Sequence, residues 1–273
     1  MGFLLVMKAE VVRALIIMRR YWFATIMGMA IGYAMLLMLV GGFMMAGDKV
    51  TGMMDGQQAT TWAFRFIVGM LAFSVVGMYT QGLQGMARTG ELEQVSMSPH
   101  GLVTLFLARS AVSVCTSIPS LAIILSLLAV TLKGTLHFAP FHTVVLLALT
   151  YTNLIGFGFM VGGLVLIFKQ VGQIAMLLRL AMMGLAFVAS EQVETWTPAL
   201  RWAAHALPIT DAVICLNHVI IRGQELDGRH VSVFAHPSFY FLIINALFWT
   251  SLGILCFRTM ESYSRRKGTL GVY

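Results

Sequence analysis

The chain has 273 residues, of which 59% are hydrophobic and only 11% are charged, and its formal net charge is +7. Soluble domains carry roughly 25% charged residues, so this composition excludes an ordinary water-exposed globule. The length and the long apolar stretches predict a single transmembrane domain over residues 1–273, with short loops.

The first predicted element is a helix over residues 3–20 that lies in the membrane interface. On a helical wheel Glu10, Arg13 and Arg20 share one side, and Arg19 lies at the edge of the apolar arc, where its long stem can snorkel. Five charges in this segment make it a poor lipid-crossing element, which favours an interfacial helix over a ragged extension of the first span. Arginines punctuate the first twenty residues and no small-residue cleavage site follows a short apolar core, so we expect no cleaved signal peptide.

Six apolar stretches follow that are long enough, at about 20 residues, to cross a bilayer core as helices. Their predicted bounds are 22–46, 62–86, 102–132, 141–168, 172–189 and 238–258. The fifth is barely long enough. The fold class is therefore all-α, a polytopic membrane protein with six transmembrane helices.

Lysines and arginines are unevenly divided between the two predicted sides. With the N-terminus inside, the inner segments hold twelve of them against four glutamates, and the outer segments hold five against seven acids. The inner ones are Lys8, Arg13, Arg19, Arg20, Arg88, Arg109, Lys169, Arg179, Arg258, Arg265, Arg266 and Lys267. By the positive-inside rule this predicts a multi-pass protein of the plasma membrane with both termini cytoplasmic. The basic excess is thus a topology signal, and no nucleic-acid partner is expected.

A charged segment between the second and third spans, residues 87–100, is predicted to form a short cytoplasmic helix. Two carboxylates and a glutamine lie within one turn, and Gly90 and Pro99 bracket that turn as stop and start signals. Such an exposed amphipathic helix is suited to dock into a groove on a soluble partner, although a charged loop between spans can also be a solvated loop.

The order Thr89-Gly90-Glu91-Leu92-Glu93-Gln94, then Ser96-Met97-Ser98-Pro99, resembles the "GTLEQL..SP" signature of type-2 ABC export permeases. The interfacial helix with Glu10, Arg13, Arg19 and Arg20 is a second family feature. A third is the outer segment 197–222, which is similar to the family's "P..LR …NPLT …R..G" stretch of short re-entrant helices between spans five and six; Leu207 stands where the family commonly has asparagine. The residues that the resemblance assigns to ATPase coupling are Gly90, Glu91, Leu92, Glu93, Gln94, Ser98 and Pro99.

The resemblance implies a non-catalytic permease subunit. It implies a cytoplasmic ABC ATPase as partner, a second permease copy or paralogue, and contact with membrane lipid. ATP and Mg would bind the ATPase, since no lysine here follows a glycine as a phosphate-binding loop requires. The expected cargo is a hydrophobic or amphiphilic compound such as a drug, an antibiotic or a lipid-like molecule, exported as in multidrug resistance; polysaccharide and cofactor export stay open. An ion-coupled carrier is the alternative class, but it would need acids near the midplane, and every Asp and Glu is predicted in loops or at span ends.

A few arginines, phenylalanines and prolines within the predicted spans and the predicted outer segment are candidates for a pathway or gate. They are Arg65, Phe66, Phe73, Arg179, Pro198 and Pro208. Arg65 follows aromatic residues near a span end, where it either snorkels outward or faces the pathway. Arg179 is roughly 15 Å into the fifth span from Lys169, deep enough to require a partner or a water-filled cavity. Asn153, Asn245 and Gln173 are expected to form interhelical hydrogen bonds.

The spacing of the histidines and cysteines indicates neither a metal site nor a catalytic site. The histidines cluster on the outer side without a close i,i+4 pair, and the three cysteines form no metal-ligand spacing.

Overall fold

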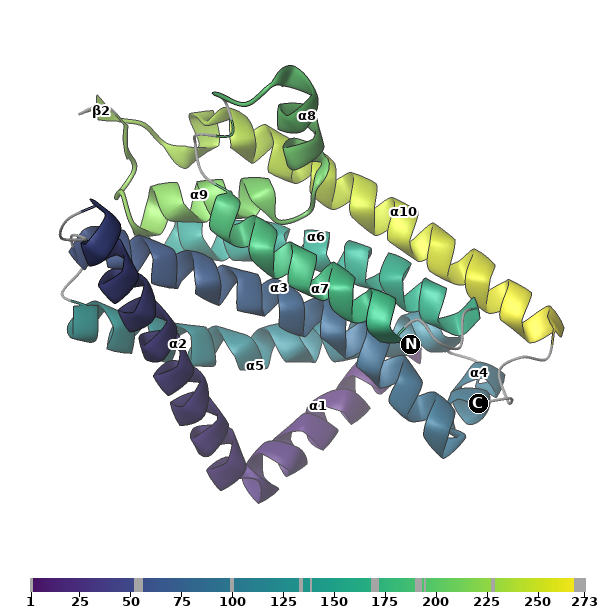
Figure 1. Cartoon of the computed structure of the whole chain (residues 1–273). Helices are drawn as coiled ribbons and strands as arrows, with labels where there is room; N and C mark the ends of the chain where they lie inside the picture. The colour runs from purple at the N-terminus through teal and green to yellow at the C-terminus, as the bar shows by residue number, and fades with distance from the viewer. Residues whose placement is uncertain are drawn as a thin grey trace. The chain divides into compact units, whose positions relative to one another are not determined.

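The computed structural model describes residues 2–51, 56–98, 101–132, 135–137, 139–167, 172–189, 193, 195–226 and 229–267. Within these ranges the chain is almost wholly helical (Figure 1). The helices are α1 (Gly2–Arg20), α2 (Trp22–Thr51), α3 (Gly56–Thr89), α4 (Glu91–Met97), α5 (Gly101–Leu132), α6 (Pro140–Ile167), α7 (Gly172–Val188), α8 (Pro198–Ala206), α9 (Thr210–Ile220) and α10 (Pro237–Lys267). Two short strands, β1 (Glu225–Leu226) and β2 (Arg229–His230), pair antiparallel, and a 3-10 turn, η2 (Val233–Ala235), precedes α10.

Five helices in the described part of the chain are long and apolar enough to cross a membrane, which confirms a helical protein with several candidate spans. They are α2 over Trp22–Gly42, α3, α5, α6 and α10. The predicted fifth span coincides with α7, whose 17 residues measure about 25 Å against a bilayer core of about 30 Å. The pair α8 and α9 reaches span length only if its bend of 82° is ignored. The count of six therefore stays a prediction. Residue 168, the predicted end of the fourth span, lies outside the described residues.

A sharp turn at Tyr21 separates α1 from α2 (Figure 1). Helical hydrogen bonds continue through it, from the Tyr21 amide to the Ile17 carbonyl at 2.8 Å and from the Thr25 amide to the Tyr21 carbonyl at 2.9 Å. The break falls where the charged segment gives way to an uncharged apolar run, as predicted from the sequence.

The chain divides into two compact units, with boundaries inside α3, inside α5 and between α5 and α6. The first comprises residues 1–66 and 104–136. In it the Tyr33 hydroxyl of α2 lies 2.6 Å from the Thr131 hydroxyl and 3.1 Å from the Leu127 carbonyl of α5. The Gln57 amide oxygen accepts hydrogen bonds from the Thr135 amide and hydroxyl, both at 3.1 Å. The Tyr33 contacts join α2 to α5, and the Gln57 contacts join the start of α3 to the segment that follows α5. The single domain expected from the sequence is not tested by this division.

The second unit, residues 67–103 and 137–273, is built around α6. Tyr79 of α3 lies against Phe159 of α6, with ring centroids 4.7 Å apart, and Leu83 lies one turn further on, beside Gly162. Because the contacts advance together along both chains, this part of α3 runs parallel to α6.

Helix α10 also runs parallel to α6. The Thr250 hydroxyl donates to the Thr152 carbonyl at 3.1 Å, and the Ser264 hydroxyl donates to the Leu166 carbonyl at 2.9 Å. Between these bonds Gly156 and Gly253 bring the two backbones into direct contact. Small residues at such a crossing are the usual means of close helix packing in lipid.

Helix α7 runs antiparallel to α3. Gly69 of α3 faces Met183, where an added Cβ would be 3.1 Å from the Met183 carbonyl, and Gly172 at the start of α7 faces Gln84. The described chain thus runs one way along α6, the opposite way along α7 and the first way again along α10.

Candidate functional site

Most residues predicted to carry function lie in four places in the fold: α4, the buried face of α7, the elbow between α8 and α9, and α1. Each of these places is built from contacts within one unit.

Gly90 sets the direction of α4. Its φ of +73° is left-handed, a conformation that glycine adopts without the steric cost of a Cβ. The chain therefore ends α3 at Thr89 and starts a new helix at Glu91 within one residue.

The predicted coupling residues of α4 divide into an anchor and an outward surface. Leu92 is 1% exposed, whereas Glu93 and Gln94 are exposed and Glu91 is half-buried. Met97, which is not among the predicted coupling residues, is 85% exposed one turn after Glu93. Ser98 is described as extended backbone after α4, and Pro99 lies outside the described residues. The outward surface is thus acidic and amide-bearing with one large apolar side chain.

Arg179 is held on the side of α7 that packs on α3. Its side chain is 7% exposed, and its Nε donates to the Phe73 carbonyl at 3.0 Å. The guanidinium carbon lies 3.8 Å from the centroid of the Phe73 ring, a cation–π contact. Gly77 makes this placement possible, because a Cβ at that position would collide with the guanidinium. Two of the candidates chosen from the sequence, Phe73 and Arg179, are therefore in contact.

The other candidates for a pathway or gate lie elsewhere. Arg65 and Phe66 fall in the first unit and are half-buried, and the Arg65 guanidinium carbon is 5.8 Å from the Trp62 ring centroid. Pro198 is the first residue of α8, where its missing amide hydrogen costs no helical bond. Pro208 forms the elbow between α8 and α9.

The elbow reaches the middle of α6. The Asn153 amide nitrogen, halfway along α6, donates to the Pro208 carbonyl at 2.9 Å. Helix α9 then leads back towards the start of α6, where the His137 amide donates to the Ile220 carbonyl at 2.8 Å. All eleven residues of α9 are buried.

A buried polar cluster, His205, Asp211 and Asn245, closes the elbow on α10. His205 Nδ1 lies 2.8 Å from the Asp211 carboxylate, and the Asn245 amide nitrogen donates to the His205 carbonyl at 2.5 Å and to Asp211 at 3.4 Å. The exposed fractions are 5%, 1% and 8%. The His205 ring also stacks on Phe241, with centroids 4.6 Å apart. The expectation of an interhelical hydrogen bond is confirmed for Asn245, whereas Asn153 bonds the turn between α8 and α9. Gln173 is exposed and has no hydrogen bond among the described residues.

Asp211 corrects one expectation from the sequence. The sequence predicts every Asp and Glu in loops or at span ends, but Asp211 lies in the first turn of α9, at the elbow that meets α6 at mid-length. The six-residue spacing between His205 and Asp211 spans a proline bend, so no regular periodicity brings the two residues into register. The bend alone brings His205 and Asp211 together, and Pro208 is the feature of the sequence that indicates a bend there.

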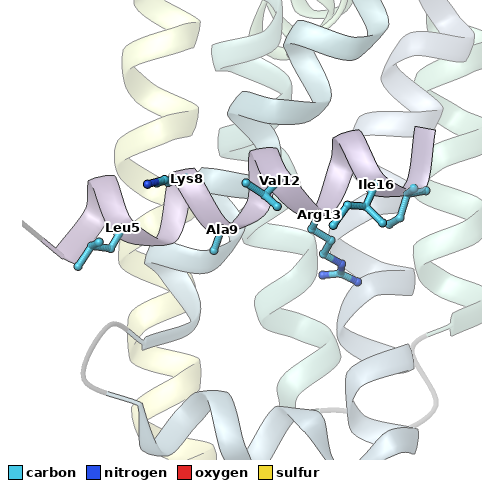
Figure 2. A pocket seen from close by; sticks show the side chains of 7 residues that line it. Leu5, Lys8, Ala9, Val12, Arg13 and Ile16 are labelled. Carbon is cyan, nitrogen blue, oxygen red and sulfur yellow. The ribbon is translucent and has the colours of Figure 1, made fainter. Parts of the chain in front are cut away.

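Helix α1 carries an open groove of about 650 Å³ on its surface. The residues that line it are Leu5, Lys8, Ala9, Val12, Arg13, Ile16 and Ile17, and Figure 2 shows most of their side chains spread along the length of the helix. Leu4, Leu5 and Ile16 are exposed by 71%, 64% and 60%. The groove therefore combines exposed apolar surface with two cations.

Glu10 ties α1 to α5. Its carboxylate accepts from Arg109 Nε at 3.1 Å and pairs with Arg13 at 3.5 Å, and the Glu10 and Arg109 side chains are 13% and 15% exposed. A double-mutant cycle with Glu10→Gln and Arg109→Gln should give a coupling energy of about 1 kcal/mol. A partly buried ion pair contributes modestly more to stability than an ion pair on the surface does. Thermal unfolding of the four purified proteins measures it. The matched cycle with Arg13, which is 52% exposed, should give a smaller value; equal coupling in both cycles would contradict the contact.

No protein-family model matches this chain, and no curated protein matches its sequence.

Proposed function

We propose that this chain is the transmembrane subunit of an ATP-driven exporter of the type-2 ABC permease class. In this proposal it has six spans, both termini lie in the cytoplasm, and a re-entrant hairpin lies between spans five and six. Two such subunits pair, and separate ATPases that bind ATP and Mg dock below them. The cargo is a hydrophobic or amphiphilic compound that leaves the cytoplasm or the inner leaflet.

The single observation that carries the proposal is α4. A left-handed Gly90 separates it from α3, Leu92 anchors it in the core, and Glu93, Gln94 and Met97 face outward. A short helix that is fixed to a span at one end and presents charges outward can transmit a push from a soluble partner to that span.

The directions of the packed helices support six crossings. Helices α6 and α10 run the same way, so the chain has to return between them, and α7 runs opposite to α3, which is itself parallel to α6. We therefore count α7 as the fifth span despite its 17 residues. The elbow at Pro208, bonded to Asn153 at mid-length of α6, supports a hairpin that enters the membrane and turns back.

The test is a double charge reversal, Glu91→Lys with Glu93→Lys. Replacing two acids with two lysines at a docking surface substitutes charge repulsion for attraction, and it should weaken ATPase binding about tenfold or more. The tagged full-length protein is purified from native membranes, and the co-purified ATPase is quantified by mass spectrometry and by ATP hydrolysis.

The matched control is Glu191→Lys with Glu194→Lys, the same two changes in the segment predicted on the outer side. The control should retain the ATPase. A double reversal at Glu91 and Glu93 that folds and still carries a full complement of ATPase would refute the coupling role, and a wild-type protein that brings down no ATPase would refute the class.

A proton-coupled carrier is the second candidate, and the buried pair His205 and Asp211 is the observation that favours it. A titratable pair at a mid-membrane elbow is the kind of group that such carriers use. Proteoliposomes that contain only this chain separate the two candidates, since a carrier would move cargo under a pH gradient without any ATPase.

A further inference from the structure

Arg179 is a buried cation with no counter-charge among the described residues. Its Nε bonds the Phe73 carbonyl, but no hydrogen bond or ion pair to the four Nη hydrogens is found in the described part of the chain. The buried acids of the same unit have other partners, His205 for Asp211 at 2.8 Å and Arg265 for Glu261 at 2.5 Å. A charge at mid-span is costly unless an anion or water compensates it.

The contacts of Arg179 fix the guanidinium instead of letting it snorkel. The Phe73 carbonyl accepts a hydrogen bond from Nε, and the Phe73 ring covers one face of the guanidinium. The guanidinium occupies the space that a side chain at position 77 would fill, which Gly77 leaves open. A planar cation fixed in this way is prepared to bind a carboxylate or phosphate through its remaining donors.

Two further polar side chains lie on the same face of α3. Ser74 is one turn before Gly77 and Gln81 one turn after it, and both are exposed. Neither side chain has a hydrogen-bond partner within the described ranges. Polar groups facing hydrocarbon are unfavourable, so this face is better suited to a polar ligand group than to acyl chains alone.

Exposed apolar side chains flank these polar groups. Met70, on the same α3 face, is 43% exposed, and Met176 and Leu180 of α7 are 53% and 41% exposed. A ligand with a charged head at Arg179 therefore has apolar surface available for an attached hydrocarbon body.

We propose that Arg179, Ser74 and Gln81 form a binding site for the anionic group of an amphiphile. A carboxylate or phosphate pairs with the Arg179 Nη groups and accepts hydrogen bonds from Ser74 and Gln81, and the hydrocarbon lies along Met70 and α7. That this amphiphile is the exported cargo rests on the proposed function; the binding site itself does not.

A second copy of the chain is a weaker occupant. Each copy brings the same helices, in which the described buried acids already have basic partners. An identical surface therefore offers Arg179 no free carboxylate at this depth, whereas an anionic amphiphile supplies one.

The experiment is photocrosslinking of a diazirine derivative of oleate to the full-length protein in nanodiscs of phosphatidylcholine, with the labelled peptides mapped by mass spectrometry. We expect labelling on α3 and α7 that excess oleate competes away and oleyl alcohol does not. Arg179→Gln should weaken binding about tenfold or more, Arg179→Lys should retain most of it, and Gln81→Leu, a change at an exposed position, should weaken it a few-fold. Arg258→Gln removes an exposed arginine of α10 as the matched control and should bind like the wild type.

Equal competition by oleate and oleyl alcohol, or undiminished binding by both Arg179→Gln and Gln81→Leu, would overturn the proposal. So would an Arg179→Gln protein that changes only its oligomeric state while no anion competes, since the face that holds Arg179, Ser74 and Gln81 would then be a surface between copies. Competition by phosphatidic acid as well as oleate identifies membrane lipid as a source of the anion; competition by oleate alone identifies a single-chain ligand. The crosslinking uses no ATPase and no ATP. A protein that shows no competed labelling but co-purifies with an ATPase refutes the binding site and not the exporter. A protein that shows competed labelling but co-purifies with no ATPase refutes the exporter and not the binding site.

Discussion

Asp211→Ala should lower the unfolding free energy by about 3 kcal/mol or more, the largest loss we expect from one substitution. The change removes one member of a pair whose side chains are 5% and 1% exposed, and it leaves His205 Nδ1 and the Asn245 amide without the carboxylate. Breaking a buried pair from one side is costly because the remaining polar group cannot regain water. Thermal unfolding in detergent, followed by limited proteolysis between α8 and α10, measures the loss.

Asn217→Ala is the matched control on the same buried helix. The Asn217 amide oxygen is buried and has no hydrogen-bond partner among the described residues, so its removal leaves no partner unsatisfied. We expect less than half the destabilisation of Asp211→Ala. Comparable losses in the two proteins would mean that the cluster contributes no more than ordinary packing in α9.

Gly253→Ala should destabilise the contact between α6 and α10 by about 1–3 kcal/mol, although it adds a single methyl group. A Cβ at Gly253 would lie 2.8 Å from the Gly156 carbonyl carbon and closer still to its oxygen. Both atoms are backbone, so no rotamer change relieves the overlap, and the two helices have to separate. The loss is measured as a fall in the midpoint of thermal unfolding and in the yield of monodisperse protein.

Gly184→Ala in α7 is the control for the same chemical change. Nothing lies within 4 Å of a Cβ at that position. Alanine has the higher helix propensity, so this variant should be as stable as the wild type or slightly more stable. If both variants unfold at the wild-type temperature, α6 and α10 do not approach each other as closely as the structure shows.

The sequence by itself determined where the helices lie. The segment 3–20, predicted as a helix, is α1 at Gly2–Arg20, and the predicted spans 102–132 and 172–189 coincide with α5 and α7. The segment 197–222, predicted to form short helices, contains α8 and α9. Apolar run length, proline position and charge are local properties, and in lipid the backbone has to satisfy its hydrogen bonds within each segment. The helix ends are less well determined, since α3 and α10 extend beyond the predicted 62–86 and 238–258.

The tertiary structure decided which of these residues meet. Arg179 and Phe73 were both selected from the sequence, but the cation–π contact between them and the role of Gly77 depend on the antiparallel register of α3 and α7. The pairing of His205 with Asp211 depends on an 82° bend that no periodicity encodes. Such contacts join residues far apart in the sequence or across an irregular turn, and side-chain packing selects among many registers of similar apolar content. The position of α4 was predicted from the sequence. Only tertiary packing decides that Leu92 is buried and that the outward surface includes Met97.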